Sequence, residues 1–379
     1  MKLGNNLYFP APLCLLKTTV TEVAIVMTSD LKKVVVSAVT WLHQYLCLPR
    51  TKQVRYSDEE YFSLLAFLAV NNCAAADGSS VLNEQMNVPS GDALLQQLKK
   101  FDRQAVEEQF DQLFVRQFRK VAKKRKPRVT AIIDVHEQET HTKEKRTSPD
   151  VRGGKHKNGT NFFFQFATIQ ILWKEQVVTM GVRLYGRNRA LRDLVDELVQ
   201  HVQQYCTIKL LLLDRGFRDV ELLNQLEHLH VSMLMPSFSD KRTRKALATM
   251  RWHRRRWAFR NAKCDYADVT LLKATLPDGK TVGFYTTMQN TWWHPPSYFL
   301  DAYKRRWTIE TGYRVQNQFL AKTTCILGAV RLYYFSYAVA LHNLWLCLRN
   351  KIITVRFTVL RLKTLLGNLL LKISAEAPT

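Results

Sequence analysis

The sequence of 379 residues lacks the cysteine pattern of a disulfide-bonded or zinc-binding protein. Seven cysteines are an odd number, they are widely scattered, and no two have the two-residue spacing of a zinc knuckle. This usage is typical of a reduced, cytosolic protein. The cysteines are Cys14, Cys47, Cys73, Cys206, Cys264, Cys325 and Cys347.

Long apolar runs are also missing. The longest, Tyr333 to Leu348, has 16 residues and contains His342 and Asn343, whereas about 20 are needed to span a bilayer. The first 17 residues are interrupted by Asn and Pro, so they make a poor signal peptide. We therefore expect a cytoplasmic protein with no membrane contact, in which residues 333–348 form a buried helix.

Glycine and proline are scarce, with 14 and 11 residues, which excludes a collagen-like repeat. Hydrophobic residues make up 46% and aromatic residues 11% of the chain, which excludes a disordered basic tail. The length allows one large core or two ordinary ones.

Acidic residues are few relative to basic ones: 32 Asp and Glu face 56 Lys and Arg, for a net charge of +24. Such an excess favours a polyanionic partner, and nucleic acid ahead of membrane. The excess is unevenly distributed: +6 in residues 1–128, +1 in 129–236, +8 in 237–300 and +9 in 301–379.

The apolar spacing predicts an α/β protein. Residues 1–128 show helical spacing, at 34–46 and 60–68 for example, and end in a basic run, Arg116 to Arg128, that we interpret as a boundary. This first region is predicted to be a helical, DNA-binding domain.

A mixed sheet with flanking helices is predicted from 129 to 236. Strands are expected at 129–135, 161–173, 176–185, 209–213 and 231–235, and helices at 190–205 and 220–229. The first three strands should form an antiparallel meander. Residues 237–300 are basic and β-rich and resemble an insertion rather than sheet core, and residues 301–379 are expected to be C-terminal helices.

Three acidic residues are candidates for chemistry. Asp134 and Asp214 each follow an apolar run, where a carboxylate is costly unless it is solvated, paired or bound to a cation. On adjacent strands the two could share a divalent metal, although each could equally cap the segment that follows it. Glu310 is the only acid between Asp301 and Glu376.

Glu310 lies among cations at helical spacing. Arg306, Glu310 and Arg314 are four residues apart and would share one helix face, with Tyr303 a turn earlier. A solvated, salt-bridged face is the ordinary meaning of this spacing, and helix packing is the ordinary role of Tyr303.

These motifs resemble an insertion-sequence DDE transposase of prokaryotes, of the insertion sequence four type. The resemblance is carried by Asp134, by Asp214 followed by Arg-Gly-Phe, and by the Tyr-x2-Arg-x3-Glu pattern of Tyr303, Arg306 and Glu310. It covers roughly residues 129–350. Many members have a Lys seven residues after the Glu, where this chain has Asn317, and we assign that role to Arg314 instead.

The resemblance implies an RNase H-like catalytic domain that cuts and rejoins DNA. Asp134, Asp214 and Glu310 would hold two Mg²⁺ or Mn²⁺ ions for in-line displacement at phosphorus. Tyr303, Arg306 and Arg314 would contact the phosphates. The implied partners are double-stranded DNA, as element ends and target, and a second copy of the chain, in the cytoplasm and nucleoid of a prokaryote.

Other motifs are weaker. His136 and His141 are five apart and follow a strand, so they do not form a zinc-protease motif, and we expect both in a loop near the metal site. The glycine-rich residues 152–159 lack the order of a phosphate-binding loop and are predicted to be a mobile basic turn facing DNA.

A basic run lies between two tryptophans. Arg254, Arg255 and Arg256 are predicted to bind DNA, with Trp252 and Trp257 stacking on bases. A solvated basic strand with both tryptophans packed inward is an equal alternative.

Two rival functions remain open at this stage: an inactive or repurposed DNA-binding relative, and a metal-dependent nuclease with the same fold.

Overall fold

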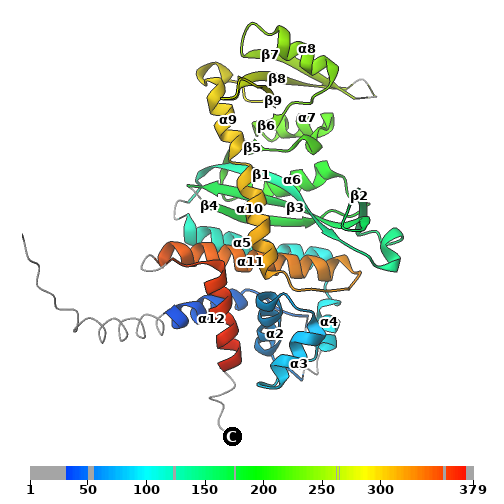
Figure 1. Ribbon diagram of the computed structural model, residues 1–379, viewed down its shortest axis with the longest axis vertical. Coiled ribbons are helices and arrows are strands. Elements are labelled where there is room, and N and C mark those ends of the chain that lie inside the picture. The colour runs from blue at the N-terminus through cyan, green and yellow to red at the C-terminus, as the bar shows by residue number, and fades with distance from the viewer. Residues whose placement is uncertain are drawn as a thin grey trace, which may run out of the picture.

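The computed structural model describes residues 31–49, 55–122, 125–174, 176–261, 263, 265–352 and 356–372. The described residues form a nine-stranded mixed sheet with helices on both faces, as Figure 1 shows. The predicted α/β class and the mixed sheet with flanking helices are confirmed.

Helices precede the sheet, as predicted. A helix spans residues 31–43, and four more follow: α2 Asp58–Asn71, α3 Ala75–Asn83, α4 Gly91–Leu98 and α5 Arg103–Val121. Helix α2 begins with a capping box, in which Ser57 and Glu60 each accept from the other's backbone N–H. These helices share one apolar core with the C-terminal helices, and Lys363 of the last helix bonds Asn72 Oδ1 at 2.7 Å.

The centre of the sheet alternates strands and helices. Its elements are β1 Arg128–Glu139, β2 Val151–Lys157, β3 Thr160–Trp173, β4 Gln176–Leu184, α6 Leu191–Gln203, β5 Thr207–Leu212, α7 Val220–His228 and β6 Met233–Pro236, with short 3-10 turns η1 Lys143–Arg146 and η2 Arg215–Phe217. The predicted meander is confirmed, because β3 pairs antiparallel with β1 and with β4. Strands β1, β5 and β6 are parallel.

The glycine-rich segment was wrongly predicted as a mobile turn. It forms strand β2, which pairs with β3, and only Asn158 and Gly159 make the turn between them. Their φ angles are 47° and 78°. Two successive positive φ values are what a two-residue hairpin turn needs.

The segment after β6 extends the same sheet. Its elements are α8 Lys241–Thr249, β7 Arg254–Arg260, β8 Tyr266–Thr275, β9 Thr281–Thr286, η3 Thr291–Trp293 and α9 Pro296–Lys304. The prediction of an insertion outside the sheet core is wrong in this respect, because β9 pairs with β6 and the strand order is β2-β3-β1-β5-β6-β9-β8-β7.

The C-terminal part is helical with breaks: α10 Trp307–Gln316, η4 Asn317–Phe319, α11 Gly328–Lys351 and α12 Val359–Lys372. Helix α11 is almost wholly buried, which confirms the buried helix predicted at 333–348. Within the described residues, every helix is too short or too polar to cross a lipid bilayer.

The strand pattern explains the two cores. Ile132 and Leu212 face the core that contains α10 and α11, while Ile133 and Leu211 face the core that contains α6 and α7. This alternation is the period-two pattern of strands covered on both faces. The central sheet is therefore fixed from both sides, and the side chains where its parallel pairing ends are held at defined positions.

Candidate active site

Asp134 and Asp214 lie at matching positions on neighbouring strands. Strands β1 and β5 are parallel, and their last aligned pair is Ile132 with Leu212. Each aspartate comes two residues after its member of that pair. The prediction that they lie at strand ends holds for Asp214, whereas β1 continues to Glu139, so that only its pairing with β5 ends before Asp134.

Asp134 is a largely buried carboxylate. Its Oδ1 accepts from Val135 N at 3.0 Å and its Oδ2 lies 3.4 Å from Arg306 Nη1. The pKa of Asp134 is raised to about 6, chiefly by burial and in smaller part by the charges of Asp214 and Glu310, against the opposing effect of Arg306. Asp214 and Glu310 are thus each near enough to Asp134 to repel its carboxylate.

Asp214 also has the capping role left open by the sequence. It is the N-cap of η2, and its carboxylate accepts from Gly216 N. The side chain stays partly exposed, so capping and a position beside Asp134 occur together.

Arg306 lies between Asp134 and Glu310. Its Nη1 faces Asp134, and its Nη2 lies 3.5 Å from Glu310 Oε1. Arg306 is 9% exposed, while the Glu310 side chain is 62% exposed. The predicted continuous helix through Tyr303 and Arg314 is wrong, because α9 ends at Lys304 and α10 begins at Trp307, with Arg306 at the break.

The other two predicted residues differ in placement. Tyr303 lies 5.7 Å from the Arg306 guanidinium, measured to its ring centre, and burial raises its pKa to about 12. It also packs against Phe284, 5.3 Å between ring centres, so its packing role is present too. Arg314 is exposed and makes no hydrogen bond or ion pair with any part of the chain that the structure describes. The structure therefore does not bring Arg314 to the acids.

The donor set suits a divalent cation of the hard kind. Three carboxylates are the ligands that Mg²⁺ or Mn²⁺ prefers, and the Arg306 guanidinium already stands as a cation between two of them. In the described ranges, however, no three His, Cys, Asp or Glu side chains form a group that could hold a metal ion. The residues fit such an ion by chemistry, and their side chains are not gathered around one point.

His136 also lies beside this site, and the prediction of its position is wrong. It was predicted in a loop but lies in β1, stacked between Tyr313 and Phe335 at 4.7 and 5.1 Å between ring centres. His141 does lie in a loop. Had the predicted strand been extended beyond Asp134, the alternation of side chains along it would have placed His136 on the same face as Asp134.

Tyr313 completes this side of the site. Its hydroxyl lies 2.5 Å from Thr168 Oγ1, and Thr168 is the β3 residue paired with Asp134. Helix α10 is therefore anchored directly beside the carboxylate.

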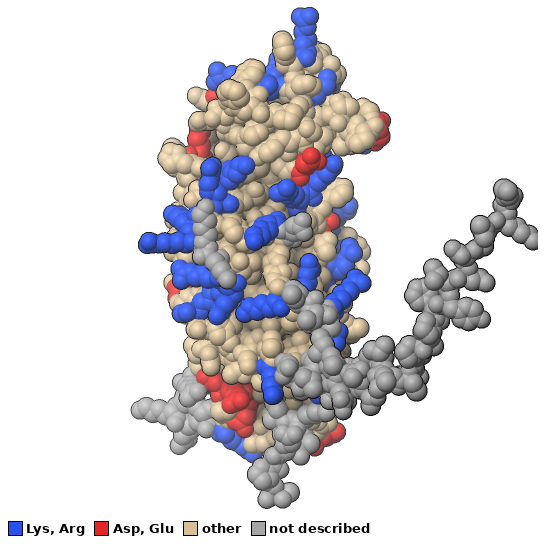
Figure 2. All heavy atoms as spheres, turned by 90° about the vertical axis from the view of Figure 1, so that its left-hand side faces the viewer, with Lys and Arg blue, Asp and Glu red and all other residues tan. Residues whose placement is uncertain are grey.

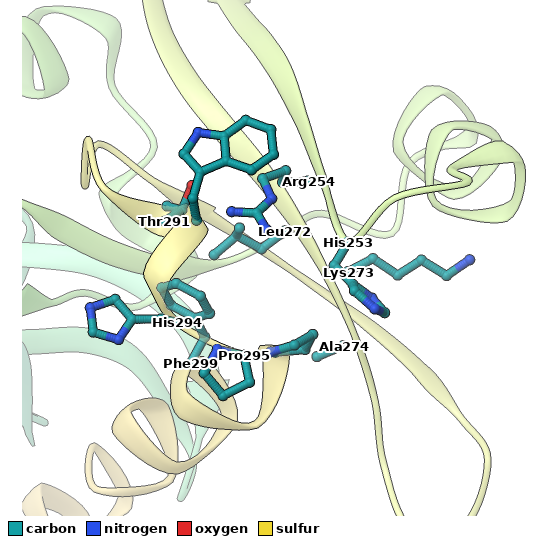
Figure 3. Close-up of a pocket in the computed structure, with 11 residues that line it drawn as sticks. His253, Arg254, Leu272, Lys273, Ala274, Thr291, His294, Pro295 and Phe299 are labelled. Carbon is teal, nitrogen blue, oxygen red and sulfur yellow. The ribbon is translucent and has the colours of Figure 1, made fainter.

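The basic run on β7 borders a separate cavity of about 330 Å³, drawn in Figure 3. Arg254 extends from β7 toward the segment that carries Thr291, whereas Lys273 points away from it. The Arg254 guanidinium lies 3.8 Å from the ring centre of Trp292, and its buried Nη1 has no hydrogen-bond partner in the described residues.

The rest of that run is exposed. Arg255 points to solvent, and Arg256 pairs with Asp268 at 3.5 Å. Trp257 packs inward, as the second alternative predicts, whereas Trp252 is 77% exposed, so the prediction that both pack inward is wrong for Trp252. No contact joins these three arginines to the acids within the described chain.

Residues 125–340 match the family model described as transposase DDE domain. No curated protein matches the sequence. A solved structure described as a cryo-EM structure of piggyBac transposase synaptic complex with hairpin DNA is similar in fold, with a TM-score of 0.52 and 14% identity over 92% of this chain and 80% of that one.

Proposed function

Because the chain belongs to the DDE transposase family, we propose that it cuts element ends from DNA and joins them to a target, by the cut-and-paste route. The observation that carries the proposal is the register of β1 and β5, which sets Asp134 beside Asp214, with Glu310 linked to Asp134 through Arg306. The RNase H-like transposase fold agrees with this arrangement.

Asp134, Asp214 and Glu310 would hold the divalent ions that this family uses. When bound, such ions supply a nucleophilic hydroxide and stabilise the leaving oxygen at phosphorus. Arg306 is the residue beside them that can bind a scissile phosphate, because its guanidinium has two N–H edges already directed into the site. Tyr303, whose ring centre lies 5.7 Å from the guanidinium, would help to orient Arg306.

DNA is the proposed partner, as element ends and as target. The Arg254 pocket supports this, since a buried, unpartnered N–H beside an exposed tryptophan suits a phosphate next to a stacked base. The two ends of an element call for two copies of the chain, so a homodimer is part of the proposal. The Tyr-x2-Arg-x3-Glu pattern supports the finer assignment to the insertion sequence four type, acting in a prokaryotic nucleoid.

A DNA-binding relative that does not cut is the second candidate. It is favoured by one observation: the three acids do not form a ready group for a metal in the described structure.

One experiment separates the candidates. The purified protein is incubated with Mg²⁺ or Mn²⁺ and the DNA that flanks its reading frame. Excision at defined ends indicates a transposase, indiscriminate degradation a nuclease, and binding alone the non-cutting relative.

Variants test the residues. Asp134→Asn, Asp214→Asn and Glu310→Gln should each abolish metal-dependent cleavage and leave DNA binding. The matched control is Asp301→Asn, an exposed acid on α9 that pairs only with Lys304 among described residues, and it should cleave like wild type. Cleavage by the purified triple variant would overturn the proposal.

A further inference from the structure

A second basic surface lies on the side of the sheet where β1 and β5 begin. Figure 2 shows Lys and Arg side chains gathered in a broad band on the face that forms the left-hand side of Figure 1. We call this surface the helix-end face. It includes six described and exposed cations, Arg119, Lys120, Arg125, Lys126, Arg349 and Lys351.

The fold brings these cations together through two parallel helices. Gln117 of α5 donates to Ala340 O of α11 at 2.8 Å, and Phe110 contacts Tyr333 at 5.1 Å between ring centres. The residue separation is the same in both pairs, so the helices run side by side in one direction. Their C-terminal ends therefore lie on the same side of the molecule (Figure 1).

The strands bring further cations to that side. Pro127 O accepts from Thr207 N at 2.9 Å, which holds the start of β1 to the start of β5. Arg125 and Lys126 immediately precede this contact and are exposed.

These six cations do not stabilise the fold through ion pairs. Within the described part of the chain, none of the six forms an ion pair with a carboxylate, whereas buried Arg183 pairs with Asp111 at 2.6 Å. Segments 112–133 and 198–213, which lead to the starts of β1 and β5, contain no acidic residue, and neither does 340–352 at the end of α11.

Helix dipoles explain only part of the pattern. Cations at the C-terminal ends of α5 and α11 are favoured by the partial negative charge there, which accounts for Lys120 and Lys351. Arg125 and Lys126 lie outside any helix, so they need another reason.

The face is hollowed where the cations lie. A cavity of about 450 Å³ is lined by Arg119, Arg125, Lys126, Gln204 and Tyr205. A second, of about 420 Å³, includes Lys120, Lys351 and Trp41. Arg119 lies over the Tyr205 ring at 5.5 Å and Lys120 over Trp41 at 5.2 Å, so the aromatic rings hold the cations in place.

We propose that the helix-end face binds the phosphate backbone of a DNA duplex, without reading its sequence and apart from the candidate active site. Arg128 and Asp134 are six residues apart on β1, about 20 Å at roughly 3.3 Å per residue. A duplex on this face would lie beyond the reach of the acids. Regularly spaced phosphates match exposed cations that, in the described part of the chain, form no ion pair with a carboxylate. The proposal rests on the proposed function only in naming DNA as the polyanion.

The test is the salt dependence of binding. A short random-sequence duplex is titrated by fluorescence anisotropy in EDTA, at several NaCl concentrations, with wild type and with the triple variant Arg125→Gln, Lys126→Gln, Lys351→Gln. Each lost phosphate contact should reduce the slope of log affinity against log salt by about 0.9, so the triple variant should lose about 2.7. An unchanged slope would overturn the proposal.

The matched control removes three charges elsewhere. Lys241, Arg244 and Lys245 are exposed on α8, in the segment that carries the far edge of the sheet, and all three are changed to Gln. The slope of this control should stay close to wild type. Equal losses in the two triple variants would mean that only net charge matters, which also overturns the proposal.

A second measurement needs no variant. Wild-type protein is acetylated with and without the duplex, and each lysine is read by mass spectrometry. Lys120, Lys126 and Lys351 should be protected by DNA while Lys241 and Lys245 are not; the reverse pattern contradicts the proposal. Neither measurement involves cleavage, so a chain that fails to cut but passes both would refute the proposed function and leave this inference standing.

Discussion

Two buried histidines, His43 and His342, should make the fold sensitive to mild acid. His342 lies inside α11 with its Nδ1 unpartnered in the described residues, and His43 Nε2 bonds the Tyr337 hydroxyl at 2.8 Å. Burial lowers the pKa of each from 6.5 to about 4. The charged form is therefore excluded from the folded state well below the pH at which it appears in the unfolded chain.

The sign follows from which state binds the proton first. Each folded pKa is below its unfolded value, so the stability is complete above about pH 6.5 and is lost as the pH falls from 6.5 toward 4. Between pH 8 and pH 5.5 each histidine should cost about 1.4 kcal/mol, and the pair about 3 kcal/mol. That is a large part of the roughly 5–15 kcal/mol of a typical domain.

The assay is urea unfolding followed by circular dichroism at pH 8 and pH 5.5. His342→Phe removes one titrating group, so the difference in the free energy of unfolding between pH 8 and pH 5.5 should shrink by about 1.4 kcal/mol. Any loss of stability that is the same at both pH values does not affect this difference. His228, exposed on α7, is the control, and His228→Gln should keep the wild-type difference. An undiminished difference in His342→Phe would refute the reasoning.

Three further changes test interactions that stabilise the fold outside the candidate active site. Arg183→Met should lower the free energy of unfolding by about 3–5 kcal/mol because it leaves the buried Asp111 unpaired, whereas Arg256→Met, which breaks an exposed pair, should cost less than about 1 kcal/mol in the same urea titration. Ser57→Ala removes the capping box of α2 and should cost about 1 kcal/mol by thermal unfolding; no change would mean that the cap is not formed. Gly91→Ala would place a Cβ 2.5 Å from the backbone carbon of Ala75, so it should lower the melting temperature, with a cost of about 1–3 kcal/mol.

The central sheet was predictable because its residues obey simple periodicity. Strands covered on both faces appear as apolar runs, and the runs before Asp134 and Asp214 carry no competing signal. The pairing of these two strands then sets the two acids side by side. Sequence order alone could not give that register, but the similar apolar runs before the two aspartates favoured a placement of the acids side by side.

The missed features depend on long-range pairing. Strand β2 is built on Gly153 and Gly154, which have no side chain to reveal a strand, and its pairing with β3 decides its conformation. Likewise, β9 is a strand of the main sheet only because it pairs with β6. The residues of β9 do not show by themselves whether the strand belongs to a separate sheet or extends the main sheet.

The break at Arg306 shows why the third acid needed the structure. On an unbroken helix Arg306 and Glu310 would share a solvated face, yet Arg306 is 9% exposed and reaches Asp134. The charges of Asp214 and Glu310 act against an ionised Asp134, and one cation at 3.4 Å offsets this by about 1–4 kcal/mol, depending on the local dielectric. An arginine at this break therefore links Asp134 to Glu310 and offsets their charges before any other cation binds, which a sequence pattern of charges four apart does not reveal.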